Sequence, residues 1–431
     1  MNFHIEGGKS LSGSITINSS KNSAVGLLCA SLLNKSSTTL LNVPKIEEVY
    51  RIIEVLESIG VVTKWKGSAL TITPPKKLHL SSLNAESATK TRSIVMFMGP
   101  LVHLFSSFSI PQTGGCKLGS RTVQPHLFAL ERLGVRIVTK SDKYEVRAKK
   151  LRSNDIVLYE SGDTVTENVI MAAAKIPGKT VITMASANYM VQDLCHFLEL
   201  FGVRFEGIGT TTLTIHGVTS IDKDVSYTLS EDPIEAMLFL SIAATTNSHI
   251  TIKQCPIEFL ELELLKLEKM GFKYKASKRY LSKNGFTKLV DIETFPSTLK
   301  ALDEKLYGRP FPGLNIDNLP FFVPIAARAK GQTLIHDWVY ENRALYYLEL
   351  SKLGVQILLA DPHRVFITGP TSFKSAEVIC PPALRPAAII LIAMLAAPGN
   401  SILRNVYSIN RGYEDLATRL RELGARIEIV E

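Results

Sequence analysis

The sequence predicts an α/β fold of two domains, each composed of three similar repeats. The length of 431 residues suggests two or three domains. A unit of one amphipathic helix and two short strands recurs about every 70 residues, which is typical of an internal repeat. Helices alternate with strands throughout, so both faces of each sheet can be covered. Each repeated helix ends in an apolar residue followed by a glycine: Gly60, Gly134, Gly202, Gly271, Gly354 and Gly424.

The first and last repeats show why each element is expected. Before Gly60, apolar residues follow helical spacing at Val49, Ile52, Ile53, Leu56 and Ile59. A glycine that ends a helix adopts the left-handed conformation without strain. Strands are predicted from Val61 onwards and at Ala69–Thr73 in the first repeat, and at Arg426–Val430 in the last.

The chain is expected to divide after the third repeat, near Ser230. A strand predicted at 3–17 precedes the first helix, and by its pattern alone it could complete either domain. The longest apolar stretch, 387–397, is bounded by prolines and is too short to span a bilayer, so it predicts a buried helix. Without a spanning segment or a secretion signal, we expect the protein to be cytoplasmic.

Composition indicates a soluble protein with an anionic partner. The hydrophobic share of 45% and the charged share of 21% are ordinary for globular proteins. A net charge of +9 suits either nucleic acid or a small anion. The densest basic run is interpreted as a solvated hairpin rather than a nucleic-acid site: Lys273, Lys275, Lys278, Arg279 and Lys283.

The cysteines argue against a disulfide framework and against a zinc site. Their number is five, which is odd, and the sequence contains no CxxC pair. Cys29, Cys195 and Cys255 sit among apolar residues and are predicted to be small core residues.

Basic residues recur at predicted helix starts, where anions bind favourably: Lys21, Arg92, Arg385 and Arg411. Lys21 and Asn22 precede a helix predicted at 24–33. Arg385 directly precedes Pro386, which fits the first position of the apolar helix. Because arginine suits bidentate recognition of phosphate and carboxylate, this recurrence predicts an anionic small-molecule substrate.

Cys116 differs from the other cysteines because it stands in a glycine-rich segment, 113–121. Such a segment predicts an exposed loop. Lys117 and Arg121 lie close in sequence, and nearby cations favour the thiolate form of a cysteine. Cys116 is therefore a candidate reactive residue, with a chance exposed thiol as the alternative.

Several short motifs are spread over the whole chain: Lys21-Asn22, Asn42-Val43-Pro44, Gly114-Gly115-Cys116, Glu341-Asn342-Arg343, Leu384-Arg385 and Arg411-Gly412-Tyr413-Glu414. With them the chain resembles the enolpyruvyl transferases, most closely the UDP-N-acetylglucosamine 1-carboxyvinyl transferases of peptidoglycan synthesis. The resemblance implies two inside-out α/β domains of three repeats each, with the active site in the cleft between them. It places the first domain at 21–229 and the second at 1–20 and 230–431.

The resemblance also implies a role for each site residue. The binding residues would be Lys21, Arg121 and Arg411 for the phosphate of phosphoenolpyruvate, Arg343 and Arg385 for its carboxylate, Arg92 beside them, and Asn22 for the acceptor sugar. Cys116 would protonate the methylene carbon, and Asp317 would take the proton of the attacking hydroxyl. Lys21 is counted with these two as a catalytic residue. No metal or cofactor is implied. The expected partners are small molecules, not nucleic acid or membrane, and the expected state is a monomer or a weak oligomer.

The acceptor side departs from the family pattern. Ser161-Gly162-Asp163-Thr164 replaces a Ser-Val-Gly phosphate loop, Asn188-Tyr189-Met190 replaces Glu-Pro-Glu, and Ala383 replaces an aspartate. An acidic side chain is a poor neighbour for a diphosphate. The favoured acceptor is UDP-N-acetylglucosamine, and the alternative is another hydroxyl, such as the 3′-hydroxyl of UMP. A non-catalytic anion-binding paralogue is a third reading, against which Cys116 and Asp317 argue.

Overall fold

The computed structural model describes residues 1–112 and 122–431. Two residues with predicted roles, Cys116 and Arg121, lie outside the described residues. The described chain forms two compact units. The C-terminal unit contains Met1–Asn18 and Glu231–Glu431, and the N-terminal unit contains 19–112 and 122–230.

The described strands form six sheets, three in each unit. Five of the sheets share one plan, in which a parallel pair of strands is extended by two antiparallel strands. The sixth sheet contains three antiparallel strands within the described ranges. Together with the helices between the strands, this recurrence confirms the predicted α/β fold of six repeats.

The N-terminal unit has sheets ordered β13-β3-β5-β4, β6-β8-β7 and β11-β12-β10-β9. Its strands are β3 (Thr38–Leu41), β4 (Val62–Lys66), β5 (Ala69–Thr73), β6 (Ser107–Pro111), β7 (Arg136–Thr139), β8 (Lys143–Arg147), β9 (Asp155–Val157), β10 (Gly178–Thr183), β11 (Arg204–Glu206), β12 (Thr212–Gly217) and β13 (Val225–Thr228). Its helices are α1 (Lys21–Ala30), η1 (Ser31–Leu33), α2 (Glu47–Ser58), η2 (Leu80–Ser82), α3 (Ala85–Lys90), η3 (Arg92–Phe97), α4 (Met98–Leu101), α5 (Gln124–Arg132), α6 (Asp163–Ala173) and α7 (Tyr189–Leu200).

The C-terminal unit has sheets ordered β22-β23-β1-β24, β15-β17-β14-β2 and β18-β19-β21-β20, with β16 also paired to β17. Its strands are β1 (Asn2–Gly7), β2 (Ser12–Thr16), β14 (His249–Pro256), β15 (Lys273–Ala276), β16 (Tyr280–Leu281), β17 (Lys288–Phe295), β18 (Leu306–Tyr307), β19 (Gly331–His336), β20 (Gln356–Asp361), β21 (Arg364–Gly369), β22 (Glu377–Ile379), β23 (Gly399–Arg404) and β24 (Arg426–Val430). Its helices are α8 (Pro233–Thr246), η4 (Ile257–Phe259), α9 (Glu261–Lys269), η5 (Leu319–Phe321), α10 (Phe322–Arg328), η6 (Ala344–Leu353), α11 (Leu384–Ala396), α12 (Tyr407–Asn410) and α13 (Leu416–Glu422).

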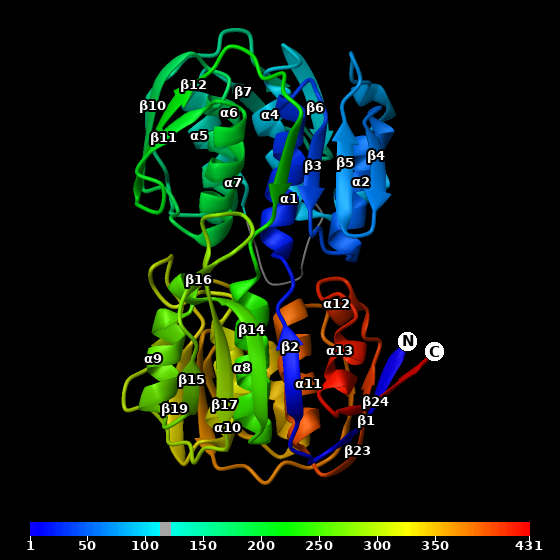
Figure 1. The fold of residues 1–431 in the computed structure, drawn as a ribbon, viewed down its shortest axis with the longest axis vertical. Coiled ribbons are helices and arrows are strands. Elements are labelled where there is room, and N and C mark those ends of the chain that lie inside the picture. The colour runs from blue at the N-terminus through cyan, green and yellow to red at the C-terminus, as the bar shows by residue number, and fades with distance from the viewer. Residues whose placement is uncertain (113–121) are drawn as a thin grey trace. The chain divides into compact units, whose positions relative to one another are not determined.

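The centre of each unit is occupied by helices, and the sheets lie outside them. In the C-terminal unit every residue of α8 is buried, as are the first twelve residues of α11, which confirms the predicted buried helix. In the N-terminal unit α6 is buried from Val165 to its end. Figure 1 shows α1 and α7 in the N-terminal unit and α8 and α11 in the C-terminal unit, each with strands around them. In this inside-out arrangement, apolar helices form the core of each unit and the sheets cover them.

The repeat glycines adopt the conformation for which they were predicted. All six have positive φ, between 88° at Gly354 and 101° at Gly60. A side chain with a Cβ would be strained at such angles. These regularly spaced glycines therefore mark the ends of the helices that correspond to one another in the six repeats.

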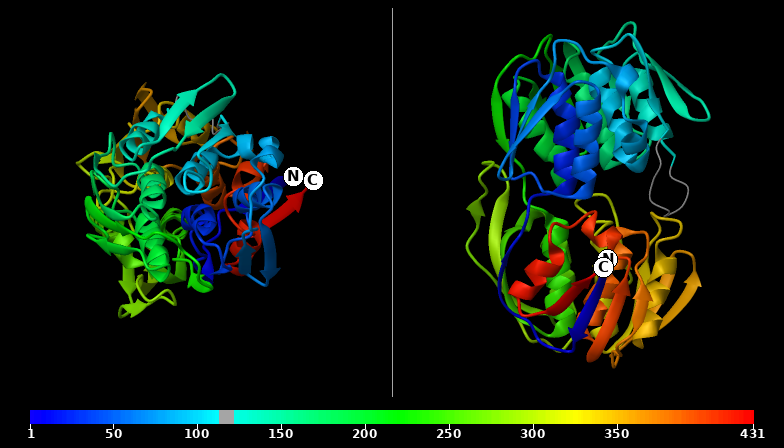
Figure 2. Two further views of the ribbon diagram at one scale, coloured as in Figure 1. Left: turned by 90° about the horizontal axis from the view of Figure 1, so that it is seen from above. Right: turned by 90° about the vertical axis from the view of Figure 1, so that its right-hand side faces the viewer.

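The N-terminal segment forms two strands, so the prediction of one continuous strand at 3–17 was wrong. Gly8 has φ of 83° and ends β1, and β2 then begins at Ser12. β1 pairs with β23 and β24, and β2 runs parallel to β14. Figure 2 shows the two chain ends close together, in agreement with the pairing of Asn2 with Val430.

Two predicted helix starts shift in the structure. α1 begins at Lys21 rather than at residue 24, because Ser20 caps it by accepting a hydrogen bond from the Ser23 amide. α11 begins at Leu384, so Arg385 is its second residue rather than a residue before the helix. Arg92 does begin η3, as predicted.

Other local predictions are confirmed. Cys29, Cys195 and Cys255 are buried, and burial raises the pKa of each thiol. The basic run at 273–283 lies on and between β15 and β16, which both pair with β17. Within the described ranges no helix has the length and apolar character needed to cross a membrane.

Candidate functional site

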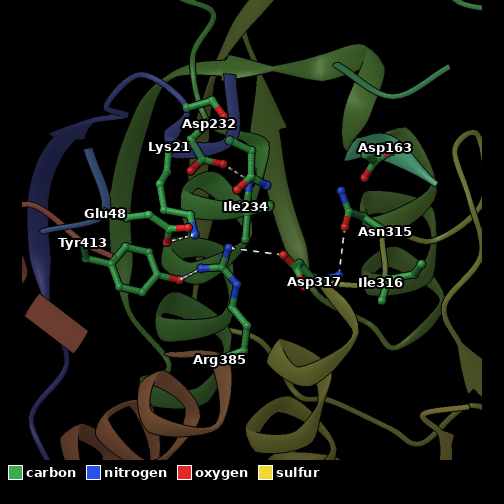
Figure 3. Close-up of polar contacts among 12 residues, drawn as sticks. Lys21, Glu48, Asp163, Asp232, Ile234, Asn315, Ile316, Asp317, Arg385 and Tyr413 are labelled. Carbon is green, nitrogen blue, oxygen red and sulfur yellow. Dashed lines mark hydrogen bonds and ion pairs between the residues drawn. The ribbon is translucent and has the colours of Figure 1, made fainter. Parts of the chain in front are cut away.

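The C-terminal unit holds Asp317 between two arginines. Arg343 Nη1 lies 3.5 Å from Asp317 Oδ1, and Arg385 Nη2 lies 3.6 Å from Asp317 Oδ2. Asp317 is 29% exposed, whereas the side chains of Arg343 and Arg385 are 1% and 8% exposed. Figure 3 shows the Arg385 guanidinium pointing toward Asp317, whose amide is held by Asn315. A carboxylate in this position can act as a base toward a bound hydroxyl.

Arg343 is held by a buried carboxylate on its other side. Its Nε and Nη2 atoms donate to the two oxygens of Asp337, at 2.6 Å and 2.8 Å. Burial alone would lower the pKa of Arg343, but the Asp337 carboxylate outweighs it and holds the pKa above its ordinary value. Arg343 also lies over the Tyr340 ring, 4.1 Å from its centroid. The guanidinium is therefore charged and fixed in one orientation.

Arg385 extends from the first turn of α11 and is bound by Tyr413. Arg385 Nη1 donates to the Tyr413 hydroxyl at 2.6 Å (Figure 3). Asp232 caps α8 by accepting from the Ile234 amide at 2.8 Å. Burial raises the pKa of Asp232 to about 6; the positive charge of Arg385 acts against the increase and the negative charge of Glu235 adds to it. This end of α8 thus carries an acid that titrates near neutrality.

Arg411 follows α12 directly and lies before α13. Its Nε atom is buried and has no hydrogen-bond partner among the described residues. A buried donor without a partner is unfavourable unless a ligand completes it. Arg411 is therefore a candidate anion-binding residue.

In the N-terminal unit the start of α1 carries the predicted pair of Lys21 and Asn22. Lys21 Nζ lies 2.9 Å from Glu48 Oε2 (Figure 3), and the two side chains are 18% and 19% exposed. Asn22 Nδ2 donates to the hydroxyl of Tyr189 at 3.2 Å. Ser20 Oγ donates to the same hydroxyl, also at 3.2 Å. The structure thus brings both predicted residues to the first turn of one helix.

Arg92 lies at the start of η3 and donates from Nη2 to the carbonyl of Thr122 at 3.0 Å. His126 is buried nearby in α5 and contacts Asn168 at 3.2 Å. Burial, with a smaller contribution from the charge of Arg92, lowers the pKa of His126 to about 3. His126 is therefore neutral at physiological pH.

Asp163 begins α6 and is held by two donors. Ser186 Oγ donates to Oδ1 at 2.5 Å, and Asn188 Nδ2 donates to Oδ2 at 3.2 Å. The first turn of a helix favours anions, and here the carboxylate of the chain itself stands at that place. The two segments that depart from the family pattern are thus joined to one another.

The residues that sequence reasoning missed are the partners of the predicted cations: Glu48, Asp232, Asp337, Tyr347 and Tyr413. Asp232 carried a usable signal, because an aspartate followed by a proline is a helix-start pattern. Glu48 carried none, because it is 27 residues from Lys21 in the sequence. Asp337 is only six residues from Arg343, but its sequence context is ordinary. Tyr413 appeared in a quoted motif without an assigned role.

The described groups can bind an anion and transfer a proton. Guanidinium and ammonium groups suit a compact substrate with phosphate and carboxylate charges. Within the C-terminal unit, Asp317 is a candidate base beside Arg343 and Arg385. In the described part of the chain no cluster of three His, Cys, Asp or Glu residues could hold a metal ion.

Comparisons with known proteins agree with this chemistry. The family described as EPSP synthase (3-phosphoshikimate 1-carboxyvinyltransferase) matches residues 5–420. A relative from Bradyrhizobium diazoefficiens, named UDP-N-acetylglucosamine 1-carboxyvinyltransferase, is 32% identical over 434 residues, covering 99% of this chain and 98% of its own. A relative of the same name from Treponema denticola is 32% identical over 429 residues, covering 100% of this chain and 99% of its own.

Solved structures share the fold. The enolpyruvyl transferase NikO from Streptomyces tendae superposes with a TM-score of 0.84 at 22% identity, covering 99% of this chain and 98% of its own. EPSP synthase from Acinetobacter baumannii superposes with a TM-score of 0.75 at 18% identity, covering 100% of both chains. With a family match over nearly its whole length, the chain belongs to the EPSP synthase family of enolpyruvyl (1-carboxyvinyl) transferases.

Proposed function

We propose that the protein transfers the enolpyruvyl group of phosphoenolpyruvate to the 3-hydroxyl of UDP-N-acetylglucosamine and releases phosphate. This reaction is the first committed step of peptidoglycan synthesis. The name shared by full-length relatives at 30% to 32% identity supports this acceptor. The structural observation that carries the proposal is the Asp317 carboxylate, flanked by Arg343 at 3.5 Å and Arg385 at 3.6 Å.

The proposed binding groups follow the predicted set. They are Lys21, Arg121 and Arg411 for the phosphate, Arg343 and Arg385 for the carboxylate, Arg92 beside them, and Asn22 for the sugar. The buried, unpartnered Nε of Arg411 supports a role in anion binding. For Arg343, Nη1 is the nitrogen turned away from Asp337 and is the one proposed to face substrate. Several fixed cations are needed because two anionic groups leave water together.

The proposed chemistry has three steps. Cys116 donates a proton to the methylene carbon of phosphoenolpyruvate, and the neighbouring carbon becomes electrophilic. The acceptor hydroxyl attacks that carbon while Asp317 removes its proton, which forms a tetrahedral phospho-adduct. Loss of a proton from the methyl group and of phosphate then restores the double bond. No metal or cofactor takes part in the proposed reaction.

One observation favours a second acceptor. Asp163 places a carboxylate at the start of α6, fixed by Ser186 and Asn188, where the resemblance implies a phosphate loop. A fixed negative charge disfavours a diphosphate. The alternative is therefore the same transfer to a hydroxyl on an acceptor without a diphosphate, such as the 3′-hydroxyl of UMP.

The acceptor is tested by phosphate release from phosphoenolpyruvate. The protein is incubated in parallel with UDP-N-acetylglucosamine, with UMP and with shikimate 3-phosphate, and released phosphate is measured over time. Release with UDP-N-acetylglucosamine supports the proposal, and release with UMP alone supports the alternative. Absence of release with all three acceptors counts against both.

The role of Cys116 is tested separately, with the epoxide fosfomycin. A cysteine that donates its thiol proton to phosphoenolpyruvate lies beside that substrate, and as a thiolate it should be alkylated by this small analogue. Intact-mass analysis should show one adduct, and peptide mapping should place it on Cys116. Cys116→Ser should lose most turnover and all labelling. An adduct on another cysteine, or full turnover by the variant, contradicts the assignment.

We further propose that the two compact units are the domains predicted at 21–229 and at 1–20 with 230–431. We also propose that the protein acts in the cytoplasm as a monomer or weak oligomer, because both proposed substrates are charged metabolites found there.

A further inference from the structure

The donors of Arg343 are divided unequally between two carboxylates. Of its five N–H groups, Nε and one on Nη2 bind Asp337, and Nη2 also donates to the Ile316 carbonyl at 2.8 Å. Nη1 makes the longer 3.5 Å contact with Asp317. The orientation of Arg343 is therefore set by Asp337, while its remaining donors are directed at Asp317.

Asp337 is a rigid anchor for this arrangement. It follows β19 directly and its side chain is fully buried, at 0% exposed. Its amide donates to the His363 carbonyl at 2.7 Å, and His363 Nδ1 contacts its carbonyl at 3.0 Å. Its Oδ2 atom also accepts from the Tyr347 hydroxyl at 2.6 Å. The backbone and the side chain of Asp337 are thus both held by contacts that do not involve Arg343.

Arg343 connects this anchor to the backbone beside the proposed base. The Ile316 carbonyl that it binds belongs to the residue immediately before Asp317. The same turn is tied by the Asp317 amide to Asn315 Oδ1 at 2.9 Å, and by the Asn315 amide to Glu263 at 3.1 Å. Movement of Arg343 would therefore release one of the described contacts that place Asp317.

We propose that Asp337 and Tyr347 are positioning residues for Asp317 that act through Arg343. A buried guanidinium needs a counter-charge, and Asp337 supplies it. Without Asp337 the nearest described carboxylate is Asp317, so Arg343 would close on the proposed base and occupy it. Asp337 thus keeps Asp317 available to the acceptor hydroxyl. This inference rests on the proposed function, because Asp317 must act as a base.

The chain offers a matched control pair. In the N-terminal unit the Tyr227 hydroxyl donates to the buried carboxylate of Asp193 at 2.5 Å. Tyr347 makes the equivalent contact to Asp337. Both tyrosines are buried and lose one hydroxyl on substitution by phenylalanine. Of the two carboxylates, only Asp337 binds an arginine that also contacts Asp317.

The experiment compares Tyr347→Phe, Tyr227→Phe and Asp337→Asn with the wild type. Phosphate release gives kcat and KM for phosphoenolpyruvate, and thermal unfolding gives Tm. We expect kcat to fall about tenfold in Tyr347→Phe and about 100-fold in Asp337→Asn. In Tyr347→Phe the KM for phosphoenolpyruvate should change less than about threefold, because the charges of Asp337 and Arg343 are both retained. Tyr227→Phe should keep kcat within about twofold while Tm falls as in Tyr347→Phe.

The outcomes separate this inference from the proposed function. An active wild type with unchanged kcat in Tyr347→Phe overturns the inference alone. Equal losses of kcat in Tyr347→Phe and Tyr227→Phe also overturn it, since they indicate a general effect on stability. If Asp337→Asn does not fold, Tyr347→Phe decides the matter because it keeps the Asp337 charge. A wild type without turnover on any acceptor overturns the proposed function and this inference together.

Discussion

Arg343 and Lys21 are both proposed to bind phosphoenolpyruvate, but the two units hold them differently. Arg343 is 1% exposed and shares two hydrogen bonds with a carboxylate that is 0% exposed. Lys21 is 18% exposed and makes one ion pair with Glu48, which is 19% exposed. The first cation has a permanent partner and one orientation. Among the described residues the second has a single charged partner, Glu48, which a substrate anion can replace.

The largest expected effect is that of Arg343→Lys. A lysine keeps the charge but cannot bind Asp337 with two donors and face Asp317 with others, so kcat/KM should fall about 100-fold. Steady-state phosphate release measures this. Arg364→Lys is the matched control, because Arg364 Nε binds Asp361 at 2.6 Å on the surface, with the arginine 55% exposed. That control should stay within about twofold of wild type. Comparable losses in both variants contradict the argument.

Asp232, beside Arg385 in the same unit, should affect stability rather than turnover. Because burial raises its pKa to about 6 from an ordinary 3.8, the native state binds a proton more tightly than the unfolded state. The associated stability is present at low pH and is lost as the pH rises from about 4 to about 6. Asp232→Asn keeps a good helix cap without a charge, so its free energy of unfolding at pH 7 should exceed that of the wild type by about 2 kcal/mol.

Urea titrations of both proteins at several pH values test this prediction. The advantage of the variant should shrink toward zero below about pH 4, where the wild-type carboxyl is protonated in both states. A constant difference across the pH range would show that the charge of Asp232 is not the cause.

A smaller effect is expected for Lys21→Arg. The variant keeps the positive charge and can still reach Glu48, so kcat/KM should fall only about tenfold. The measurement is the same phosphate-release assay. A loss of kcat/KM as large as that of Arg343→Lys would show that the position of the Lys21 side chain is as strictly required as that of Arg343.

The smallest effect should come from Glu48→Gln. Removing this carboxylate leaves Lys21 without a competitor for an incoming anion, so the KM for phosphoenolpyruvate should fall about twofold. kcat should change little. A rise in KM would indicate that Glu48 orients Lys21 for binding rather than competing with the substrate.

Much of the fold could be predicted because its signals are local. The six glycines that end helices all have positive φ, and the apolar residues before Gly60 are buried. Both features depend only on neighbours within one helix. The errors occurred where a single contact decides the boundary. The Ser20 cap moves the start of α1 to Lys21, and Gly8 divides the N-terminal segment.

The predicted site contained cations together with Asn22, Cys116 and Asp317, but it lacked the counter-ions Glu48 and Asp337. Arginine and lysine at element starts can be recognised in a sequence, because their chemistry belongs to the residue itself. The partner of each depends on distance in space: Asp337 becomes a counter-ion for Arg343 only when β19 and η6 bring them together. The strength of this ion pair then depends on its burial, and no sequence pattern predicts that burial.

The sequence by itself determined the repeat, the helix ends and the residue types that suit an anionic substrate, because each depends on local periodicity or on a side chain's own chemistry. The tertiary structure alone decided which carboxylate pairs with which cation, and it showed the pairing of β1 and β2 within the C-terminal unit, which the strand pattern by itself had left open. Those outcomes depend on contacts formed only in the folded chain, between residues as close in sequence as Asp337 and Arg343 or as distant as Asn2 and Val430. The burial of Arg343 and Asp337 likewise exists only after folding.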